Sequence, residues 1–280
     1  MKKFAALLLA GAMAFSMMAC GSSSDKKAGD KSSDSKKTES AKSTSASDIK
    51  VGVIYIGDEN EGYTEAHMKG IQEMKKELGL SDDQIIEKTL IPEDETCYDA
   101  AVDLAEQGCN IIFGTSFGHE SYLLQAAAEY PDVQFCHATG YQAASSGLDN
   151  MHNYFTSIYE SRYVSGVVAG MKLNEMIADG KITEDTAKVG YVGAYPYAEV
   201  ISGFTSFFLG VRSQCPSATM EVKYTNSWAS FDLEKECAES LIADKCVLIS
   251  QHADTTGAPT ACQAAGVPCV GYNISMIPTA

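Results

Sequence analysis

One segment of the sequence has the spacing of a nucleophilic serine site. Residues 114–118 read Gly-Thr-Ser-Phe-Gly, so Ser116 stands where the serine of a G-x-S-x-G turn would attack a carbonyl carbon. His252 as the base and Asp232 or Asp244 as the acid could complete a triad on paper. No His-Gly-Gly segment that could build an oxyanion hole precedes Ser116, and the short motif often occurs without the activity. A serine hydrolase using Ser116 is therefore a minor alternative, and we expect a protein that is not an enzyme.

A larger set of side chains suits reversible binding. Aromatic, amide, hydroxyl and carboxylate groups follow the apolar, strand-like runs of the chain, which is where open parallel sheets bind ligands. These strand-end candidates are Asp58, Ser116, Phe117, Tyr195, Trp228, Asp254 and Asn273. Their segments contain no Lys or Arg, which argues against a phosphate, sulfate or carboxylate ligand. The pattern favours a neutral ligand with a flat face and several hydroxyl or ring-nitrogen groups.

Each of these residues has a structural alternative to binding. Trp228, the only tryptophan, lies in the polar segment Asn-Ser-Trp-Ala-Ser, whereas a core aromatic is usually flanked by aliphatic residues. Stacking on a planar ligand, about 1–3 kcal/mol per base, is therefore favoured for Trp228. Phe117 is equally compatible with stacking and with helix packing. Asp254 and Asn273 could bind ligand or cap local backbone.

No motif for cofactor or metal chemistry occurs. The sequence lacks Walker A, G-x-G-x-x-G, H-E-x-x-H and EF-hand spacings, so we expect no cofactor and no metal site. The eight cysteines after Cys20 include no C-x-x-C pair, and several lie in apolar runs, which indicates buried thiols. Their even number leaves disulfides open.

Strand-length apolar runs alternate with segments of helical periodicity between residues 50 and 271. This alternation, which includes a strand expected at 245–250, predicts parallel sheets with helices on both faces. A stretch rich in Gly, Ala and Ser at 138–157 is expected to be a loop that joins two series of similar length. The expected fold class is α/β, with two doubly wound Rossmann-like lobes, residues 49–150 and 151–280, and a cleft between them.

At the same loops the sequence resembles the basic membrane lipoprotein (BMP) family, the solute-binding proteins of ATP-binding-cassette (ABC) importers for purine nucleosides. The resemblance covers nearly the whole folded part, in stretches at 62–67, 114–118, 131–141, 159–163, 226–228, 251–254 and 271–273. It implies a type I periplasmic-binding-protein fold with a hinge between the lobes. It also implies a purine base clamped between aromatic rings, while carboxylates and amides hold ring nitrogens or ribose hydroxyls.

Two features depart from the family pattern. Tyr63 stands where relatives usually have Trp, and it can still stack with less area. The sequence ends at Ala280, whereas family members continue with a crossing back to the first lobe, so a truncated chain without that crossing is expected.

The residues and the resemblance together define a site and its partners. The expected ligand contacts are Asp58, Tyr63, Thr64, Ser116, Phe117, Tyr195, Trp228, Asp254, Asn273 and Met276. The expected ligand is a purine nucleoside or nucleobase, and the expected protein partners are an ABC permease and its ATPase. A sugar receptor of the same fold is the main alternative.

The N-terminal residues predict export and anchoring. Lys2 and Lys3 precede an apolar run that ends at Ala19 and is too short to span a bilayer, as in a signal peptide at residues 1–19. The segment ending in Cys20 resembles a lipobox, so Cys20 is the expected lipid attachment site. Residues 20–48 are almost wholly small or polar, which predicts a disordered tether. We expect a lipid-anchored protein on the extracytoplasmic face of the cell membrane.

Composition and charge limit the remaining partners. The 280 residues contain 21 Lys and Arg against 37 Asp and Glu, a net charge of −16. Nucleic acids and anionic lipid surfaces bind clustered cations, so no nucleic-acid partner is expected and the membrane is reached through the lipid alone. A hydrophobic content of 45% is typical of a globular protein, which we expect to be a monomer.

Overall fold

The computed structural model of the chain describes residues 48–277, which belong to one compact unit. The expected signal peptide, Cys20 and the tether up to residue 47 lie outside the described residues. Within residues 48–277 no helix is long and apolar enough to cross a membrane. The eight cysteines of this part all carry free thiols, and five of them are buried.

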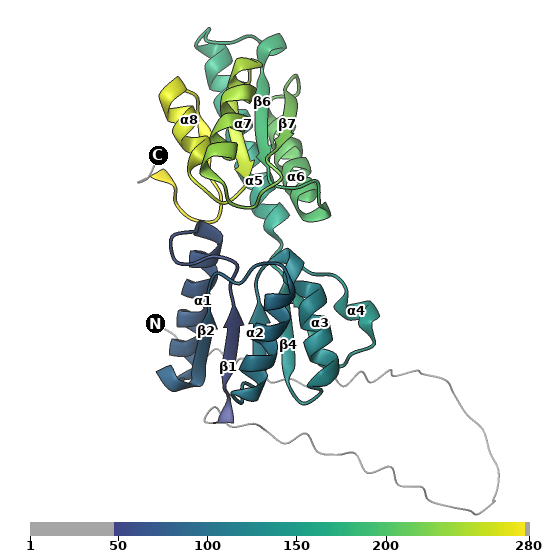
Figure 1. The fold of residues 1–280 in the computed structure, drawn as a ribbon. Coiled ribbons are helices and arrows are strands. Elements are labelled where there is room, and N and C mark those ends of the chain that lie inside the picture. Colours follow the sequence, from purple (N-terminus) through teal and green to yellow (C-terminus); the bar gives the residue numbers. More distant parts are fainter. Residues whose placement is uncertain (1–47, 278–280) are drawn as a thin grey trace, which may run out of the picture. The chain divides into compact units, whose positions relative to one another are not determined.

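The first lobe is a five-stranded parallel sheet in the order β2-β1-β3-β4-β5 (Figure 1). Its strands are β1 (Val51–Ile54), β2 (Ile85–Lys88), β3 (Ile111–Gly114), β4 (Gln134–Ala138) and β5 (Met151–Tyr154). Its helices are α1 (Gly62–Leu78), α2 (Glu95–Glu106), α3 (Glu120–Glu129) and the short α4 (Ala143–Ser146), with 3₁₀ turns at Asp82–Gln84 and Phe117–His119.

Strand β1 shows why helices cover both faces of this sheet. Its side chains alternate, as strand geometry requires, so Val51 and Val53 pack with apolar residues of α1 while Ile54 packs with Leu104 of α2. Helix α1 ends at Gly79, whose φ of 67° is a left-handed conformation that favours glycine. The hydrophobic periodicity of the sequence thus becomes two separate apolar layers around one sheet.

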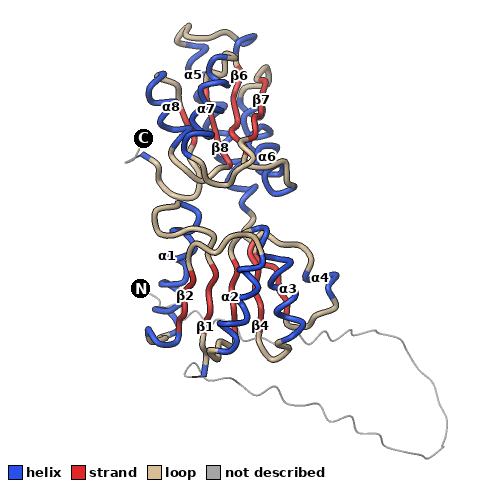
Figure 2. The backbone as a smooth tube through the Cα atoms, in the orientation of Figure 1, coloured by secondary structure: helices blue, strands red, loops and turns tan. Residues whose placement is uncertain are grey.

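The second lobe is a four-stranded parallel sheet in the order β7-β6-β8-β9. Its strands are β6 (Lys188–Gly193), β7 (Thr219–Tyr224), β8 (Leu248–His252) and β9 (Cys269–Val270). Its helices are α5 (Ile158–Ala178), α6 (Ala198–Gln214), α7 (Phe231–Ala243) and α8 (Gly257–Ala265), with a 3₁₀ turn at Glu184–Thr186. Figure 2 shows the strands of each lobe running between helices.

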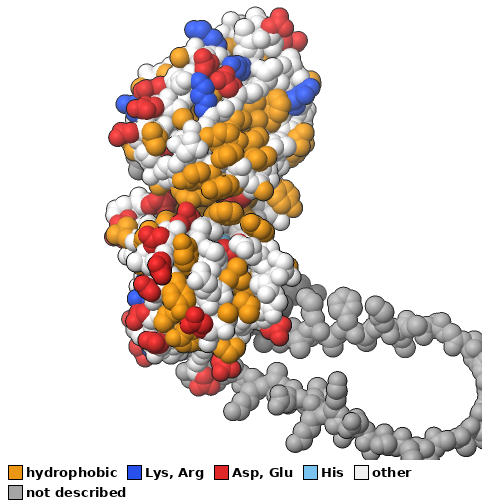
Figure 3. Space-filling model, turned by 45° about the vertical axis from the view of Figure 1, so that its right-hand side comes forward, with side chains coloured by type: hydrophobic (Ala, Val, Ile, Leu, Met, Phe, Trp, Pro, Cys, Tyr) orange, Lys and Arg blue, Asp and Glu red, His pale blue; other side chains and the backbone are white. Residues whose placement is uncertain are grey.

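Alternation along β6 again divides the core into two layers. Tyr191 packs with Leu173 of α5 and Phe207 of α6, whereas Val192 packs with Leu241 of α7 on the other face. Both lobes are therefore doubly wound α/β units, which confirms the predicted fold class. On the surface, acidic side chains are spread over the face seen in Figure 3, as the negative net charge requires.

Two local predictions were wrong. The stretch 138–157 was expected to be a loop, but its residues 151–154 form β5, which pairs with β4 at the edge of the first sheet. This strand reads Met-His-Asn-Tyr and has only one fully buried side chain, so it gives no apolar run. The strand expected at 245–250 lies at Leu248–His252, because Lys245 adopts a turn conformation with a φ of 71°.

Candidate functional site

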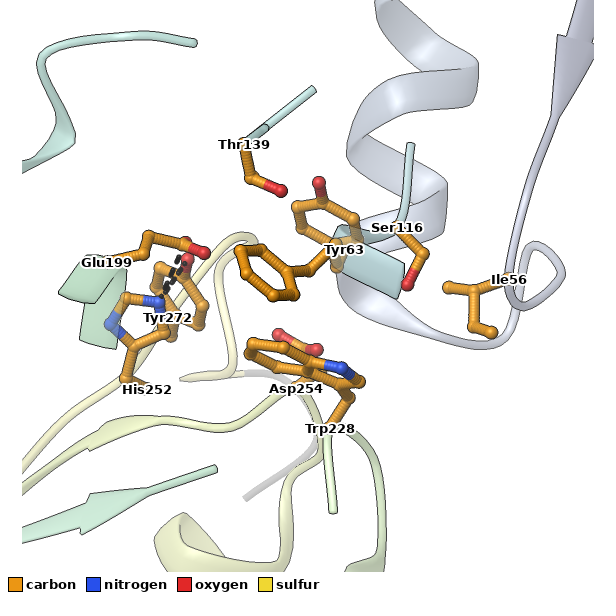
Figure 4. A pocket seen from close by; sticks show the side chains of 10 residues that line it. Ile56, Tyr63, Ser116, Thr139, Glu199, Trp228, His252, Asp254 and Tyr272 are labelled. Carbon is orange, nitrogen blue, oxygen red and sulfur yellow. Dashed lines mark hydrogen bonds and ion pairs between the residues drawn. The ribbon is translucent and has the colours of Figure 1, made fainter. Parts of the chain in front are cut away.

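A small cavity lies among loops at the carboxyl ends of strands in both sheets (Figure 4). It is lined by Ile56, Tyr63, Ser116, Phe117, Thr139, Glu199, Trp228, His252, Asp254 and Tyr272. The first four of these residues and Thr139 come from the first lobe, and the other five come from the second. Parallel-sheet topology predicts ligand sites at this edge, because the loops that follow the strands meet there.

Tyr63 is placed by the start of helix α1. The Glu61 carboxylate caps the helix by accepting hydrogen bonds from the backbone N–H groups of Tyr63 at 2.6 Å and Thr64 at 2.8 Å. The Tyr63 hydroxyl then donates to the backbone oxygen of Thr115 at 2.5 Å. The Tyr63 ring also contacts His67 edge-on, with 4.5 Å between ring centroids. The ring is thus fixed at both ends against the loop that carries Ser116.

Glu93 organises the loop that carries Phe117. One of its carboxylate oxygens accepts hydrogen bonds from the Ser116 hydroxyl at 2.6 Å and from the Gly118 backbone N–H at 2.7 Å. These two donors flank Phe117. Gly118 can approach so closely because it lacks a Cβ, which would lie 2.6 Å from the Glu93 side chain. Glu93 was missed in the sequence, because it lies in a loop without a chemical motif.

The same contacts show how Ser116 is used. Its hydroxyl is paired with a carboxylate, while the imidazoles of His119 and His137 bond to its backbone N–H and carbonyl oxygen. His252 pairs with Glu199 at 3.1 Å. Within residues 48–277 no histidine is hydrogen-bonded to the Ser116 hydroxyl, so the nucleophile–base contact of a serine hydrolase is not formed.

Aromatic rings from both lobes form a continuous stack beside the cavity. Phe117 stacks on Tyr197 with centroids 4.8 Å apart and an interplanar angle of 20°. Tyr197 stacks on Tyr195 at 5.1 Å and 15°, and Tyr195 meets Trp228 edge-on at 5.0 Å and 61°. Offset and edge-on pairs of this kind are favourable for aromatic rings. Tyr195 therefore contacts the edge of Trp228, while Phe117 and Trp228 themselves line the cavity.

Asp254 is one of two carboxylates that line the cavity. It is buried, and the side-chain amide of Asn273 donates to its Oδ1 at 2.6 Å. Burial, with repulsion from Glu61 as a second cause, raises the pKa of Asp254 well above its usual range. Hydrogen-bond donors on a ligand would favour the ionised carboxylate, so this side chain is suited to accept from N–H or O–H groups.

Glu234 connects the two loops that carry Trp228 and Asp254. This fully buried carboxylate accepts hydrogen bonds from the backbone N–H groups of Ser230 at 3.2 Å and Thr255 at 3.1 Å. The backbone N–H of Asp254 also donates to the backbone oxygen of Trp228 at 2.9 Å. Burial is the main reason that the pKa of Glu234 is raised to about 7.

A buried arginine stands behind the cavity wall. The Arg162 side chain comes from α5, and its guanidinium lies 4.0 Å from the centroid of the Tyr272 ring. Sequence reasoning found no cation near the site because it considered strand ends, and Arg162 lies on a helix. Glu199 and Tyr197, at the start of α6, were missed for the same reason.

Five candidate residues lie away from the cavity wall. Tyr195 is one of them, and its ring contacts the edge of Trp228. The Asp58 carboxylate accepts from the backbone N–H of Asn60 at 2.9 Å, and the Thr64 hydroxyl accepts from that of Gly57 at 3.2 Å, so both serve local backbone. Asn273 reaches the cavity only through Asp254. Met276 is buried beside Gly271 and lines a separate pocket next to α8.

The space between the walls is small. The cavity measures about 30 Å³, which is enough for one or two ordered water molecules. Pockets for organic ligands enclose about 300 Å³ or more, so this cavity alone is too small for one. A more open hollow of about 320 Å³ shares Ile56, Trp228 and Asp254 with it. No group of three His, Cys, Asp or Glu side chains in the described part of the chain is arranged to hold a metal ion.

Comparisons with known proteins agree with this architecture. A purine-binding protein from Brucella abortus is 35% identical over 233 residues, which are 82% of this chain and 61% of that protein. A putative ABC transporter glucose-binding protein from Haloferax volcanii is 32% identical over 80% of this chain and 53% of its own length. This chain thus spans little more than half the length of these relatives.

Solved structures show the same fold. A solute-binding protein of an ABC transporter system from Aeropyrum pernix matches with a TM-score of 0.66 and 19% identity, over 80% of this chain and 61% of its own. A corresponding protein from Conexibacter woesei matches with a TM-score of 0.61 and 22% identity, over 80% of this chain and 70% of its own. Both support the predicted type I periplasmic-binding-protein fold.

One protein family matches nearly all of the residues that the structure describes. Its sequence model, for the PnrA-like substrate-binding proteins of ABC transporters, matches residues 48–276. This is the BMP family that the motifs at 114–118 and 251–254 resemble. The chain therefore belongs to the Bmp family of PnrA-like ABC transporter substrate-binding proteins.

Proposed function

We propose that this protein is the receptor of an ABC importer and captures a purine nucleoside or nucleobase between its two lobes. The observation that carries the proposal is the composition of the cavity wall. Aromatic side chains of both lobes, Phe117 and Trp228, line it together with two carboxylates, Asp254 and Glu199. A purine offers flat faces for the rings and N–H groups for the carboxylates. The name of the Brucella relative supports the same ligand class.

The binding step involves no covalent chemistry. A ligand that touches both lobes stabilises the arrangement in which the walls are close, and it shifts the equilibrium by its differential affinity for that arrangement. The joined surface of the two lobes would then be presented to a permease, and a partner ATPase would supply the energy. Substrate-binding proteins of ABC importers work outside the cytoplasm, which is where the proposed receptor acts.

The proposal includes the N-terminal anchor. A cleaved signal peptide at residues 1–19, a lipid on Cys20 and a tether at 20–48 would hold a monomeric receptor near its permease. The sequence of these segments supports this arrangement, because the charge of the protein offers no attraction to an anionic membrane. Mass spectrometry of the protein purified from membranes would detect the added mass of a lipid on the peptide that begins with Cys20.

Thermal unfolding with candidate ligands tests the ligand class. Adenosine, guanosine or inosine should raise the melting temperature, because a ligand that binds only the folded protein stabilises it by mass action. Ribose and glucose are the matched controls. The Haloferax relative is named a glucose-binding protein, so a larger shift with glucose than with any purine would replace the purine proposal with the sugar alternative.

Calorimetry with a Trp228 variant tests the binding mode. Trp228→Ala should weaken purine binding at least tenfold. One stacked ring contributes about 1–3 kcal/mol, and the middle of that range exceeds the roughly 1.4 kcal/mol that a tenfold change requires. The fold should change little, since Trp228 is half-buried and lies on a loop. Unchanged affinity in this variant would remove Trp228 from the site.

A further inference from the structure

Two side chains at one end of the cavity, Glu199 and Tyr272, contact the same ring nitrogen of His252. His252 Nε2 lies 3.1 Å from a carboxylate oxygen of Glu199 and 3.1 Å from the Tyr272 hydroxyl. All three side chains line the cavity, and Figure 4 shows them grouped on the side away from Ser116 and Ile56. The other ring nitrogen of His252, Nδ1, has no hydrogen-bond partner among the described residues.

The hydrogen-bond partners of His252 indicate which of its two ring nitrogens carries the hydrogen. Burial lowers the pKa of His252, so the imidazole is neutral and carries one N–H. A carboxylate accepts hydrogen bonds and donates none, so the contact with Glu199 requires the hydrogen on Nε2. The Tyr272 oxygen then faces an N–H and acts as an acceptor toward His252. Its own hydroxyl hydrogen has no acceptor among the described contacts and is available to the cavity.

Arg162 reinforces this arrangement from behind the ring. Its guanidinium lies over the Tyr272 ring at 4.0 Å, and its side chain is only 4% exposed. Nε and Nη2 of Arg162 have no hydrogen-bond partner within residues 48–277, and no carboxylate of this part forms an ion pair with it. A buried cation over an aromatic face is attracted to the ring and helps to hold it in place.

The charge of Arg162 also acts on the titration of Tyr272. Burial raises the pKa of Tyr272 well above its ordinary value, and the nearby guanidinium opposes that rise. The phenol therefore stays protonated at neutral pH. Its hydroxyl keeps one hydrogen that it can donate to a ligand.

We propose that Tyr272 is the hydrogen-bond donor that selects the ligand, that it reads one acceptor atom of a purine, and that Arg162 is the positioning residue behind it. This inference rests on the proposed purine function and deepens it. In their ionised form Asp254 and Glu199 accept hydrogen bonds from the ligand and donate none, so Tyr272 supplies the opposite polarity. A ligand that matches both needs N–H or O–H groups and, facing Tyr272, a ring nitrogen or carbonyl oxygen.

Calorimetry with two tyrosine variants tests the role of Tyr272. Tyr272→Phe keeps the ring and removes only the hydroxyl, and it should weaken binding of the purine nucleoside that binds best about tenfold. Tyr191→Phe is the matched control, because its hydroxyl is buried in the same lobe, has no partner among the described residues and lies away from the cavity wall. The control should bind like the wild type.

Ligand analogues identify the acceptor and separate recognition from packing. The panel is the 1-deaza, 3-deaza and 7-deaza nucleosides and, for an oxopurine, the analogue without its 6-oxygen. One analogue should bind the wild type about tenfold more weakly than the parent does. The same analogue and the parent should bind Tyr272→Phe with equal affinity. The inference about Tyr272 is overturned if the wild type binds the parent and the ratio of parent to analogue affinity is the same in Tyr272→Phe as in the wild type for every analogue. If the wild type binds no purine, the proposed function itself fails.

The role of Arg162 is tested by the same measurement, the difference in affinity between the parent nucleoside and the weaker analogue. Arg162→Met should reduce the discrimination between the parent and that one analogue at least threefold, a readout that a general loss of stability would not move. Arg212→Met is the control, because Arg212 is exposed and lies over Phe208 at 5.9 Å. If Arg162→Met does not fold, Arg162→Lys keeps the cation and changes its geometry, and it should show a smaller loss of discrimination. Full discrimination in the folded variant would contradict the role of Arg162.

Discussion

Glu93 shows how a side chain outside the cavity wall can determine the geometry of the wall. One of its carboxylate oxygens accepts two hydrogen bonds, from the residues on either side of Phe117. Hydrogen bonds to a charged group contribute about 1.5–3 kcal/mol each, so the loop has a well-defined resting position. The ring that we propose to stack on the ligand is therefore held in place by a carboxylate that does not itself line the cavity.

Glu93→Ala should weaken purine binding about tenfold, which corresponds to about 1.4 kcal/mol, because the Phe117 ring would lose its fixed position. Isothermal titration calorimetry measures this effect. Glu59→Ala, at an exposed position of a nearby first-lobe loop, should leave the affinity unchanged. The account is contradicted if Glu93→Ala binds normally while Phe117→Ala does not.

The sequence indicated part of this site and missed part of it for an identifiable reason. Tyr63, Phe117, Trp228 and Asp254 follow strands or begin a helix, and parallel topology brings such positions together. Arg162, Glu93 and Glu199 reach the site from a helix, a loop and a helix start, and their distance from the strand ends in the sequence hides their proximity. Only tertiary packing brings them near the cavity.

Helices α5 and α6 show how glycines set the packing of an element pair. A Cβ at Gly166 would lie 2.0 Å from the backbone oxygen of Phe207, and one at Gly210 would lie 2.2 Å from that of Tyr163. The two helices can therefore touch backbone to backbone only where side chains are absent. Their contact covers the face of the second sheet that carries Tyr191.

Gly166→Ala should lower the free energy of unfolding by about 1–3 kcal/mol or more, because the added methyl group forces the helices apart. Gly70→Ala is a matched control in α1, where the new methyl group meets nothing within 4 Å. It should raise stability by about 0.5–1 kcal/mol, since alanine favours a helix over glycine. Urea unfolding of both variants measures the difference, and equal effects of the two substitutions would refute this account of the α5–α6 contact.

Glu234 gives the second lobe a pH dependence of known sign. Its pKa is raised from 4.5 to about 7 in the folded protein, so the folded state binds a proton more tightly than the unfolded state does. The stability that this carboxyl contributes is fully present below pH 4.5 and is lost as the pH rises through about 7. The shift corresponds to roughly 3 kcal/mol at most.

Glu234→Gln should remove this part of the pH dependence. The difference in unfolding free energy between the wild type and the variant should change between pH 4.5 and pH 7 and stay constant above pH 8. Glu236→Gln, at an exposed position of the same helix, should show no such difference. Parallel profiles for wild type and Glu234→Gln across this range would show that the raised pKa is absent.

Most elements of the fold could be predicted from periodicity alone. Helix α1 and strand β6 have clear apolar faces, and their alternation with other elements predicts two doubly wound lobes. Strand β5 could not be predicted, because an edge strand with one buried residue has no hydrophobic pattern. The position of β8 depends on the left-handed turn at Lys245, for which the local sequence has no glycine.

At the scale of the whole molecule, the account depends on two lobes that share one ligand. Phe117 of the first lobe and Trp228 of the second both line the cavity, and the space between the walls is about 30 Å³. Under the proposed function, a purine would separate the lobes on entry and be enclosed again afterwards. The ligand contributes the contacts that make the enclosed arrangement the more stable one.

Intrinsic tryptophan fluorescence tests this claim most directly, because Trp228 is the only tryptophan in the chain. Titration with the purine nucleoside that raises the melting temperature most should quench or shift the emission in a saturable way, with the midpoint equal to the calorimetric dissociation constant. Glucose should leave the emission unchanged. Purine binding seen by calorimetry without any change in Trp228 emission, or a saturable change with glucose alone, would contradict the account.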